Sequence, residues 1–124
     1  MSLALSLAAF LLVAIGLAHS YLGERYLLVR LLRRGDLPRL LGSAQFTAQV
    51  LRFAWHITTV AWWGFAAILL HLARGPLSAQ VVAALIGLTF VTTGLIALIG
   101  SRGRHLSWPI FLLIGALALW AGAR

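Results

Sequence analysis

Residues 78–100 read SAQVVAALIGLTFVTTGLIALIG, a run that contains no charged side chain. A helix needs about 20 apolar residues to cross the roughly 30 Å hydrocarbon core of a bilayer. Three further runs of the same character cover residues 3–22, 53–72 and 106–123. Backbone polar groups in lipid must be satisfied within their own segment, so all four runs are expected to be helices. The sequence therefore predicts an all-α polytopic membrane protein, a four-transmembrane-helix bundle in a single domain over residues 1–124.

The composition agrees with a membrane protein and excludes several other classes. Of the 124 residues, 62% are hydrophobic and 10% are charged, whereas soluble domains average about 45–50% apolar and about 25% charged residues. A disordered chain needs low hydrophobicity, and a nucleic-acid-binding domain needs a soluble basic surface with exposed aromatic side chains. The absence of cysteine excludes disulfide frameworks and thiolate metal sites. We therefore expect the lipid bilayer, and no nucleic acid, as the partner of most of the chain.

The basic residues, all of which are arginine, divide unevenly between the two sides of the four runs. Eight lie in the connection 23–52 and in the last turn: Arg25, Arg30, Arg33, Arg34, Arg39, Arg52, Arg102 and Arg104. Only Arg74 and Arg124 lie on the opposite side. Basic residues accumulate in cytoplasmic loops. The pattern thus predicts a multi-pass protein of the bacterial inner membrane, with both termini periplasmic, residues 23–52 cytoplasmic, and anionic lipid headgroups attracted to the arginine-rich inner face.

Turn and capping residues mark the ends of the apolar runs. Gly75 and Pro76 predict a short turn between the second and third runs, and Ser43 is a candidate N-cap for the helix that carries the second. Residues 23–34 alternate leucine pairs with arginines, which predicts that the first helix continues past the bilayer as an interfacial helix.

Small residues follow one face of the later runs. Gly87, Gly94 and Ser101 recur at seven-residue intervals, and Gly115 lies in the middle of the last run. Lipid gives helices no hydrophobic reason to associate, so membrane helices approach each other through small side chains. These stripes therefore predict close-packed seams.

A polar stripe runs along the second apolar run and the residues before it. Its members recur at steps of three and four residues: Gln45, Gln49, Arg52, His56, Thr59 and Trp63. That spacing places them on one helix face, which must point into the protein or toward water. The inner end of this stripe is expected to meet the end of the first run, where His19 and Glu24 lie.

Two histidines are expected at the same depth near the inner face. Counted from the ends of the first two runs, His19 and His56 each lie about three residues, or roughly 5 Å, inside the same boundary. Neutral imidazole is a common ligand of transition metals. His19 and His56 are therefore candidate ligands of haem b or of a divalent transition metal, and Glu24 and His105 are candidates to complete a metal site.

The same side chains also have interpretations that need no ligand. Glu24 and Arg52 carry opposite charges at similar depth, so a structural ion pair between them would satisfy both. His19 and His56 would equally be satisfied by hydrogen bonds across the helices or to serine and threonine hydroxyls.

The segment His19-Ser-Tyr-Leu-Gly-Glu-Arg25, followed by Arg52-Phe-Ala-Trp-His-Ile-Thr-Thr59, resembles small uncharacterised four-span inner-membrane proteins of proteobacteria. The resemblance covers roughly residues 16–72. It implies a bacterial inner-membrane setting and brings no assigned activity with it.

Three functions follow from these expectations. The leading one is binding of a metal ion or haem through histidines near the cytoplasmic face, in a redox or metal-handling role. The alternative is a non-catalytic accessory or scaffold subunit that contacts a membrane-protein partner or assembles as a homo-oligomer. The third is a small-molecule or proton carrier. No catalytic residue is assigned, so whether the protein is an enzyme stays open.

Overall fold

The computed structural model describes residues 2–124, and this part of the chain is 80% helix with no strand. The elements in order are α1 (Leu3–Leu22), η1 (Gly23–Leu28), α2 (Val29–Leu31), α3 (Ala44–Arg74), α4 (Ala79–Gly100) and α5 (Ser107–Gly122). The segment η1 is π-helical, and it joins α1 to α2 in one continuous helix over Leu3–Leu31. The all-α prediction is confirmed, and the first helix continues beyond its apolar run.

Serine caps start the two central helices. The hydroxyl of Ser43 accepts a hydrogen bond of 3.1 Å from the Phe46 amide at the start of α3. The hydroxyl of Ser78 accepts one of 3.2 Å from the Val81 amide at the start of α4. These bonds satisfy amides that have no partner within the helix. The cap at Ser43 explains why α3 begins well before the apolar run that predicted it.

The substitution Ser43→Ala is expected to fray the first turn of α3, because an N-cap contributes about 1 kcal/mol. Hydrogen–deuterium exchange at the Phe46 and Thr47 amides measures this fraying directly. The control is Ser43→Asp, which retains a side-chain oxygen that accepts the same bond. Equal protection of these amides in the Ala variant and the wild type would contradict the expectation.

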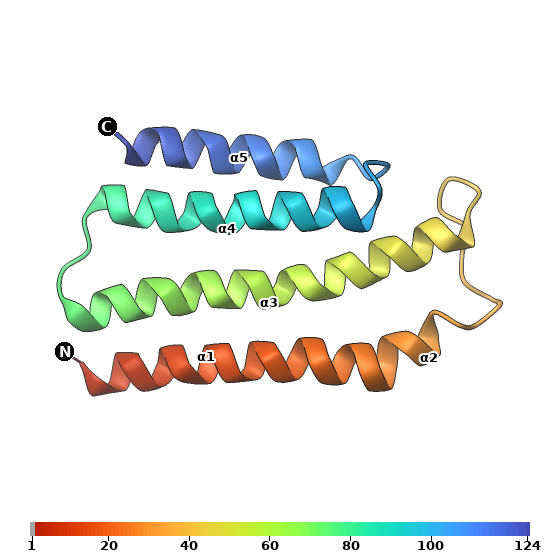
Figure 1. The fold of residues 1–124 in the computed structure, drawn as a ribbon, viewed down its shortest axis with the longest axis horizontal. Helices are drawn as coiled ribbons and strands as arrows, with labels where there is room; N and C mark the ends of the chain where they lie inside the picture. Colours follow the sequence, from red (N-terminus) through yellow and green to blue (C-terminus); the bar gives the residue numbers. More distant parts are fainter. Residues whose placement is uncertain (1) are drawn as a thin grey trace.

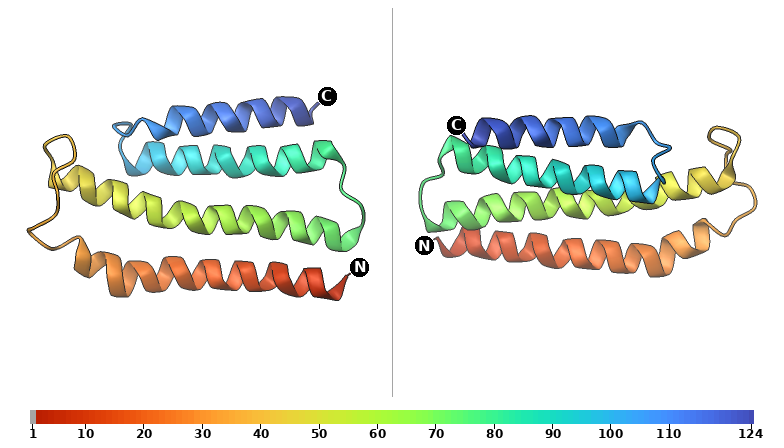
Figure 2. Two further views of the ribbon diagram at one scale, coloured as in Figure 1. Left: turned by 180° about the vertical axis from the view of Figure 1, so that it is seen from behind. Right: turned by 45° about the horizontal axis from the view of Figure 1, so that its top comes forward.

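The four long helices form a single layer and do not close around a common core. Each contacts only its neighbours in the order α1, α3, α4, α5. Among residues 2–124, no Cα atom of α1 lies within 8 Å of one in α4 or α5, and none of α3 lies within 8 Å of one in α5. Figure 1 shows the row, and the two views of Figure 2 keep the same order of helices. The predicted bundle is therefore an open layer with two exposed faces.

Three helical segments are long and apolar enough to cross a membrane: Leu3–Leu31, Ala44–Arg74 and Ala79–Gly100. The last helix, Ser107–Gly122, is apolar but has 16 residues, which corresponds to about 24 Å at 1.5 Å per residue. The fourth predicted span is therefore shorter than the roughly 30 Å of a typical hydrocarbon core.

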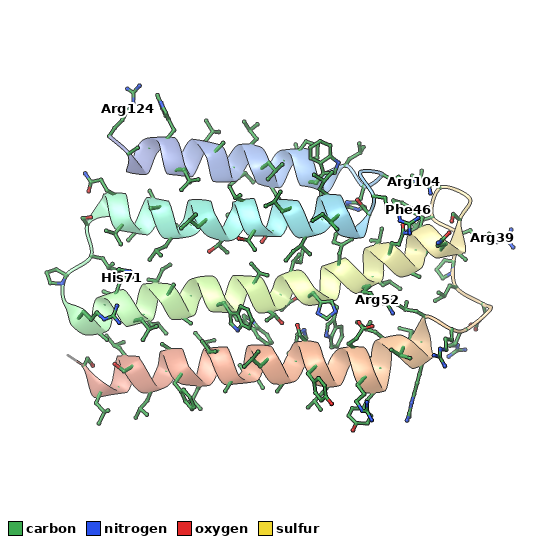
Figure 3. All side chains as sticks on the ribbon, viewed as in Figure 1. Arg39, Phe46, Arg52, His71, Arg104 and Arg124 are labelled. Atoms are coloured by element: carbon green, nitrogen blue, oxygen red, sulfur yellow. The ribbon has the colours of Figure 1, made fainter. Side chains whose placement is uncertain are left out.

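Both ends of the chain lie at the same end of the layer (Figure 1). The Ser2 amide also donates a hydrogen bond of 2.8 Å to the Ala73 carbonyl near the end of α3. The connections 32–43 and 101–106 lie at the opposite end and contain five arginines. The adjoining helices carry Arg25, Arg30 and Arg52, so eight of the ten arginines lie toward that end. We call it the Arg-rich end. Figure 3 shows Arg39, Arg52 and Arg104 there, with His71 and Arg124 at the other end.

The predicted small-residue seam on α4 is confirmed at its contact with α5. A Cβ atom added to Gly87 would lie 2.9 Å from the Leu119 amide nitrogen and 3.0 Å from the Gly115 carbonyl oxygen. One added to Gly94 would lie 3.1 Å from the Leu112 amide nitrogen. The two backbones approach closely because these positions have no side chain. Ser101 ends this face fully buried, where its hydroxyl donates to the Ala97 carbonyl.

The long connection between α2 and α3 contains one exposed ion pair. The Arg34 guanidinium donates hydrogen bonds of 2.9 and 2.8 Å to the two carboxylate oxygens of Asp36. These bonds lower the pKa of the Asp36 carboxyl below its ordinary value of 3.8. Asp36, one of the two acidic residues of the sequence, is therefore paired within this connection.

Candidate functional site

The polar stripe of α3 faces α1 along most of its length. Arg52, His56, Thr59 and Trp63 all contact side chains or carbonyls of α1 or η1. Gln49 lies one turn before Arg52 and instead lines a cavity between α3 and α4. The predicted polar face therefore exists. Most of its residues contact α1 or η1, whereas Gln49 lies toward α4.

Glu24 lies between Arg52 and His56. Its Oε1 atom is 3.0 Å from Arg52 Nη2, and its Oε2 atom is 3.2 Å from His56 Nε2. The side chains of Glu24 and His56 are 35% and 30% exposed, while that of Arg52 is 50% exposed. The carboxylate thus bridges a permanent cation and an imidazole, and all three side chains are partly exposed.

Hydroxyl groups continue this arrangement from His56 along α1. His56 Nδ1 lies 2.9 Å from Ser20 Oγ, and Ser20 Oγ lies 2.7 Å from Thr59 Oγ1. Thr59 Oγ1 in turn donates to the Gly16 carbonyl at 3.2 Å. We call Glu24, His56, Ser20 and Thr59 the polar chain. It leads from the Arg-rich end toward the middle of α1 and α3.

Forming all four hydrogen bonds of the polar chain at once requires a defined set of donors. Thr59 uses its only hydroxyl proton on the Gly16 carbonyl, so Ser20 must donate to Thr59. Ser20 then has no proton left, and His56 Nδ1 must be the donor to Ser20. The remaining contact, between His56 Nε2 and Glu24, needs either an imidazolium with a carboxylate or a neutral imidazole with a carboxylic acid. When all four hydrogen bonds form, the polar chain therefore holds one more proton than it does with an ionised Glu24 and a neutral His56.

His19 is engaged on a different side of α3. Its ring stacks on the Trp55 indole with centroids 4.4 Å apart and an interplanar angle of 4°. Its Nε2 atom lies 3.3 Å from the Trp55 carbonyl, and Trp55 Nε1 donates to the His19 carbonyl at 3.1 Å. Both predicted ligand histidines therefore have protein partners, and a haem or metal bound by the two would have to displace them.

His105 lies apart from the other candidate ligands. It is held in the last turn, where Nδ1 is 2.7 Å from the Ser107 hydroxyl, and its ring packs edge-on to Phe53 with centroids 5.2 Å apart. Across residues 2–124, no three histidine, aspartate or glutamate side chains are grouped so that they could hold a metal ion. The predicted set of His19, His56, Glu24 and His105 is thus not brought together. The structure does contain the Glu24–Arg52 ion pair.

The π-helical turn under Glu24 was not expected from the sequence. The segment η1 starts at Gly23, against which the Trp55 indole packs so closely that an added Cβ would lie 2.2 Å from Trp55 Nε1. Single π-helical turns occur frequently at functional sites. Here the wider turn carries Glu24 and packs against α3. The one available sequence signal was Gly23 itself, a residue without a side chain directly before Glu24.

Ser20, His56 and Glu24 are the residue types of a hydrolytic triad, yet their surroundings do not suit acyl transfer. Such chemistry needs an exposed nucleophile and donors aimed at a developing oxyanion. Ser20 lies between α1 and α3 and donates to Thr59, and it lines none of the best-defined cavities of residues 2–124. The arrangement is better suited to holding and passing a proton.

No protein-family model, curated protein or solved structure matches the chain.

Proposed function

We propose that the protein is a small proton carrier of the membrane, in which Glu24 and His56 bind the transported proton. The observation that carries this proposal is the proton count of the polar chain, whose four hydrogen bonds need one shared proton. In this proposal the four long helices lie in the bacterial inner membrane, with the Arg-rich end toward the cytoplasm. His56 lies within the second apolar run, where ionisable groups are costly and are functional candidates by default.

Release of the proton changes the hydrogen bonds of the chain in a defined way. Once His56 is neutral and donates to an ionised Glu24, Ser20 must turn its proton to His56 Nδ1. Thr59 then has one proton for two acceptors, so the contact with either Ser20 or Gly16 loses its hydrogen bond. Loading and unloading are therefore coupled to the contact between α1 and α3.

Proteoliposomes that contain a pH-sensitive dye test the proposal. Under a potassium diffusion potential, the wild type is expected to carry protons faster than protein-free liposomes. The variants Glu24→Gln and His56→Gln are expected to abolish this flux, because each removes one of the two proton-binding groups. The matched control is His71→Gln, since His71 is exposed at the opposite end of α3 (Figure 3). Wild-type flux equal to that of empty liposomes, or flux unaffected by the first two changes, would refute the proposal.

The variant Thr59→Val tests the proton count itself. With the threonine hydroxyl gone, Ser20 is free to donate to His56 Nδ1, and the deprotonated chain no longer lacks a hydrogen bond. The proton should therefore be held less tightly, and the pH of half-maximal flux should move downward. An unchanged pH profile would show that the hydroxyls do not take part.

A second candidate is a non-catalytic accessory or scaffold subunit, and the open layer of helices favours it. Large apolar side chains are exposed on α1 and α5, including Phe10 at 67%, Leu11 at 64% and Ile110 at 58%. Lipid can cover such surfaces, and so can other membrane helices. Chemical cross-linking in native membranes separates the cases: a larger complex without proton flux favours the accessory subunit. A Soret band or stoichiometric metal in the purified protein would instead favour the haem or metal alternative.

A further inference from the structure

A cavity of about 390 Å³ lies between α3 and α4 at the Arg-rich end, on the side of Arg52 and His56 away from the hydroxyls of α1. Its polar lining is made by Gln49, Arg52, His56 and Arg102. Ile96 and Ile99 of α4 supply apolar walls on the membrane side. Two guanidinium groups beside an apolar groove match an amphipathic anion.

Arg102 lies in the turn that follows α4 and has no ion-pair partner in the described part of the chain. Its φ angle is +52°, in the left-handed region that residues with a Cβ atom adopt at a cost and glycine adopts freely. Among residues 2–124, Glu24 pairs with Arg52 and Asp36 pairs with Arg34. The side chain is therefore available to an anion that comes from outside the protein.

Gln49 adds a second unsatisfied group to the same cavity. Its Oε1 atom is buried and has no hydrogen-bond partner within residues 2–124. Buried polar atoms normally have at least one partner. Gln49 lines the cavity, so a ligand there that donates a hydrogen bond would satisfy this atom once the amide turns toward it, and the anion should therefore also carry a hydroxyl or ammonium group.

We propose that this cavity binds one anionic phospholipid. The phosphate pairs with Arg52 and Arg102, a headgroup hydroxyl or ammonium donates to Gln49 Oε1, and the acyl chains follow Ile96 and Ile99. A lipid is favoured over a soluble phosphate because apolar side chains adjoin the cavity on the surface of α4, where Ile99 is 75% exposed and Leu95 is 45% exposed. Such a site differs from general attraction of the arginines to headgroups, because it has a fixed stoichiometry. It does not depend on the proposed proton transport.

Native mass spectrometry of the full chain in detergent tests this site with phosphatidylglycerol as the probe and phosphatidylcholine as the comparison lipid. One retained phosphatidylglycerol per chain is expected. The variants Arg102→Gln and Gln49→Leu should each weaken its binding by roughly tenfold, the loss expected for one hydrogen bond to a charged or buried group. Gln49→Leu leaves the net charge unchanged, so it decides the question even where Arg102→Gln does not fold.

The matched control is Arg104→Gln, which removes the same charge from the same turn. Arg104 lies over the Phe46 ring at 5.9 Å and does not line this cavity, so its substitution should leave lipid binding unchanged. Equal losses in the Arg102 and Arg104 variants would indicate diffuse attraction and overturn the proposal. Competition by inorganic phosphate at the same concentration as the lipid would also overturn it, in favour of a soluble anion.

Discussion

The substitution Gly23→Ala is expected to force α1 and α3 apart at the Arg-rich end and to lower the free energy of unfolding by about 1–3 kcal/mol. A Cβ atom at this position would lie 2.2 Å from Trp55 Nε1, 2.4 Å from Cε2 and 2.6 Å from Cζ2. The indole cannot move away freely, because it stacks on His19 and donates to the His19 carbonyl. The added methyl group therefore has to displace a packed ring or a helix backbone.

Equilibrium unfolding in detergent micelles, followed by circular dichroism and tryptophan fluorescence, measures this loss. The control is Gly35→Ala, because no atom lies within 4 Å of a Cβ at that position. We expect the control to unfold like the wild type, and the Gly23 variant also to lose proton flux through displacement of Glu24. Equal stability of the two variants would mean that the contact between Gly23 and Trp55 does not hold the helices together.

The positions of the helices were largely predictable from the sequence, whereas their arrangement was not. Apolar runs, the Ser43 cap and the Gly75–Pro76 turn are local signals, and they agree with α1, α3, α4 and α5 to within a few residues at most of their ends. The open layer has no such signal, since a lipid-facing leucine and a leucine between helices look alike in a chain that is apolar on all sides. The π-helical turn also escaped prediction, because its extra residue is stabilised by the packing of Trp55 on Gly23 and not by any residue pattern.

The candidate site was predicted in part. Counting residues from the membrane boundary placed His19 and His56 at one depth, and Glu24 and Arg52 were expected at a similar depth to each other. The structure joins Glu24 to Arg52 and to His56. Depth alone does not give direction. Successive helical residues point about 100° apart, so Ser20 rather than its neighbour His19 faces His56, while His19 faces Trp55. His105 lies in the last turn, as expected, but its ring contacts Phe53 and Ser107 rather than the other candidate ligands.

The two histidines are consequently expected to respond very differently to substitution. His56→Leu removes the imidazole partners of Glu24 and Ser20 together. A charged or buried group left without its partner costs about 1–3 kcal/mol, so the variant should be clearly less stable than the wild type. His19→Phe keeps an aromatic ring stacked on Trp55 and loses a single contact of 3.3 Å, so its cost should stay below about 1 kcal/mol.

This asymmetry separates the proton-linked site from a bis-histidine cofactor site. Two axial ligands of one haem are equivalent, so loss of either would remove the cofactor and its stabilisation alike. In the structure only His56 belongs to the polar chain, and proton flux in liposomes should therefore survive His19→Phe and disappear in His56→Leu. Unfolding and flux measured on the same two preparations give the answer. Equal losses of stability in both variants, accompanied by equal loss of a bound chromophore, would show that the imidazoles act as a pair and that the partners seen here are exchanged for a ligand.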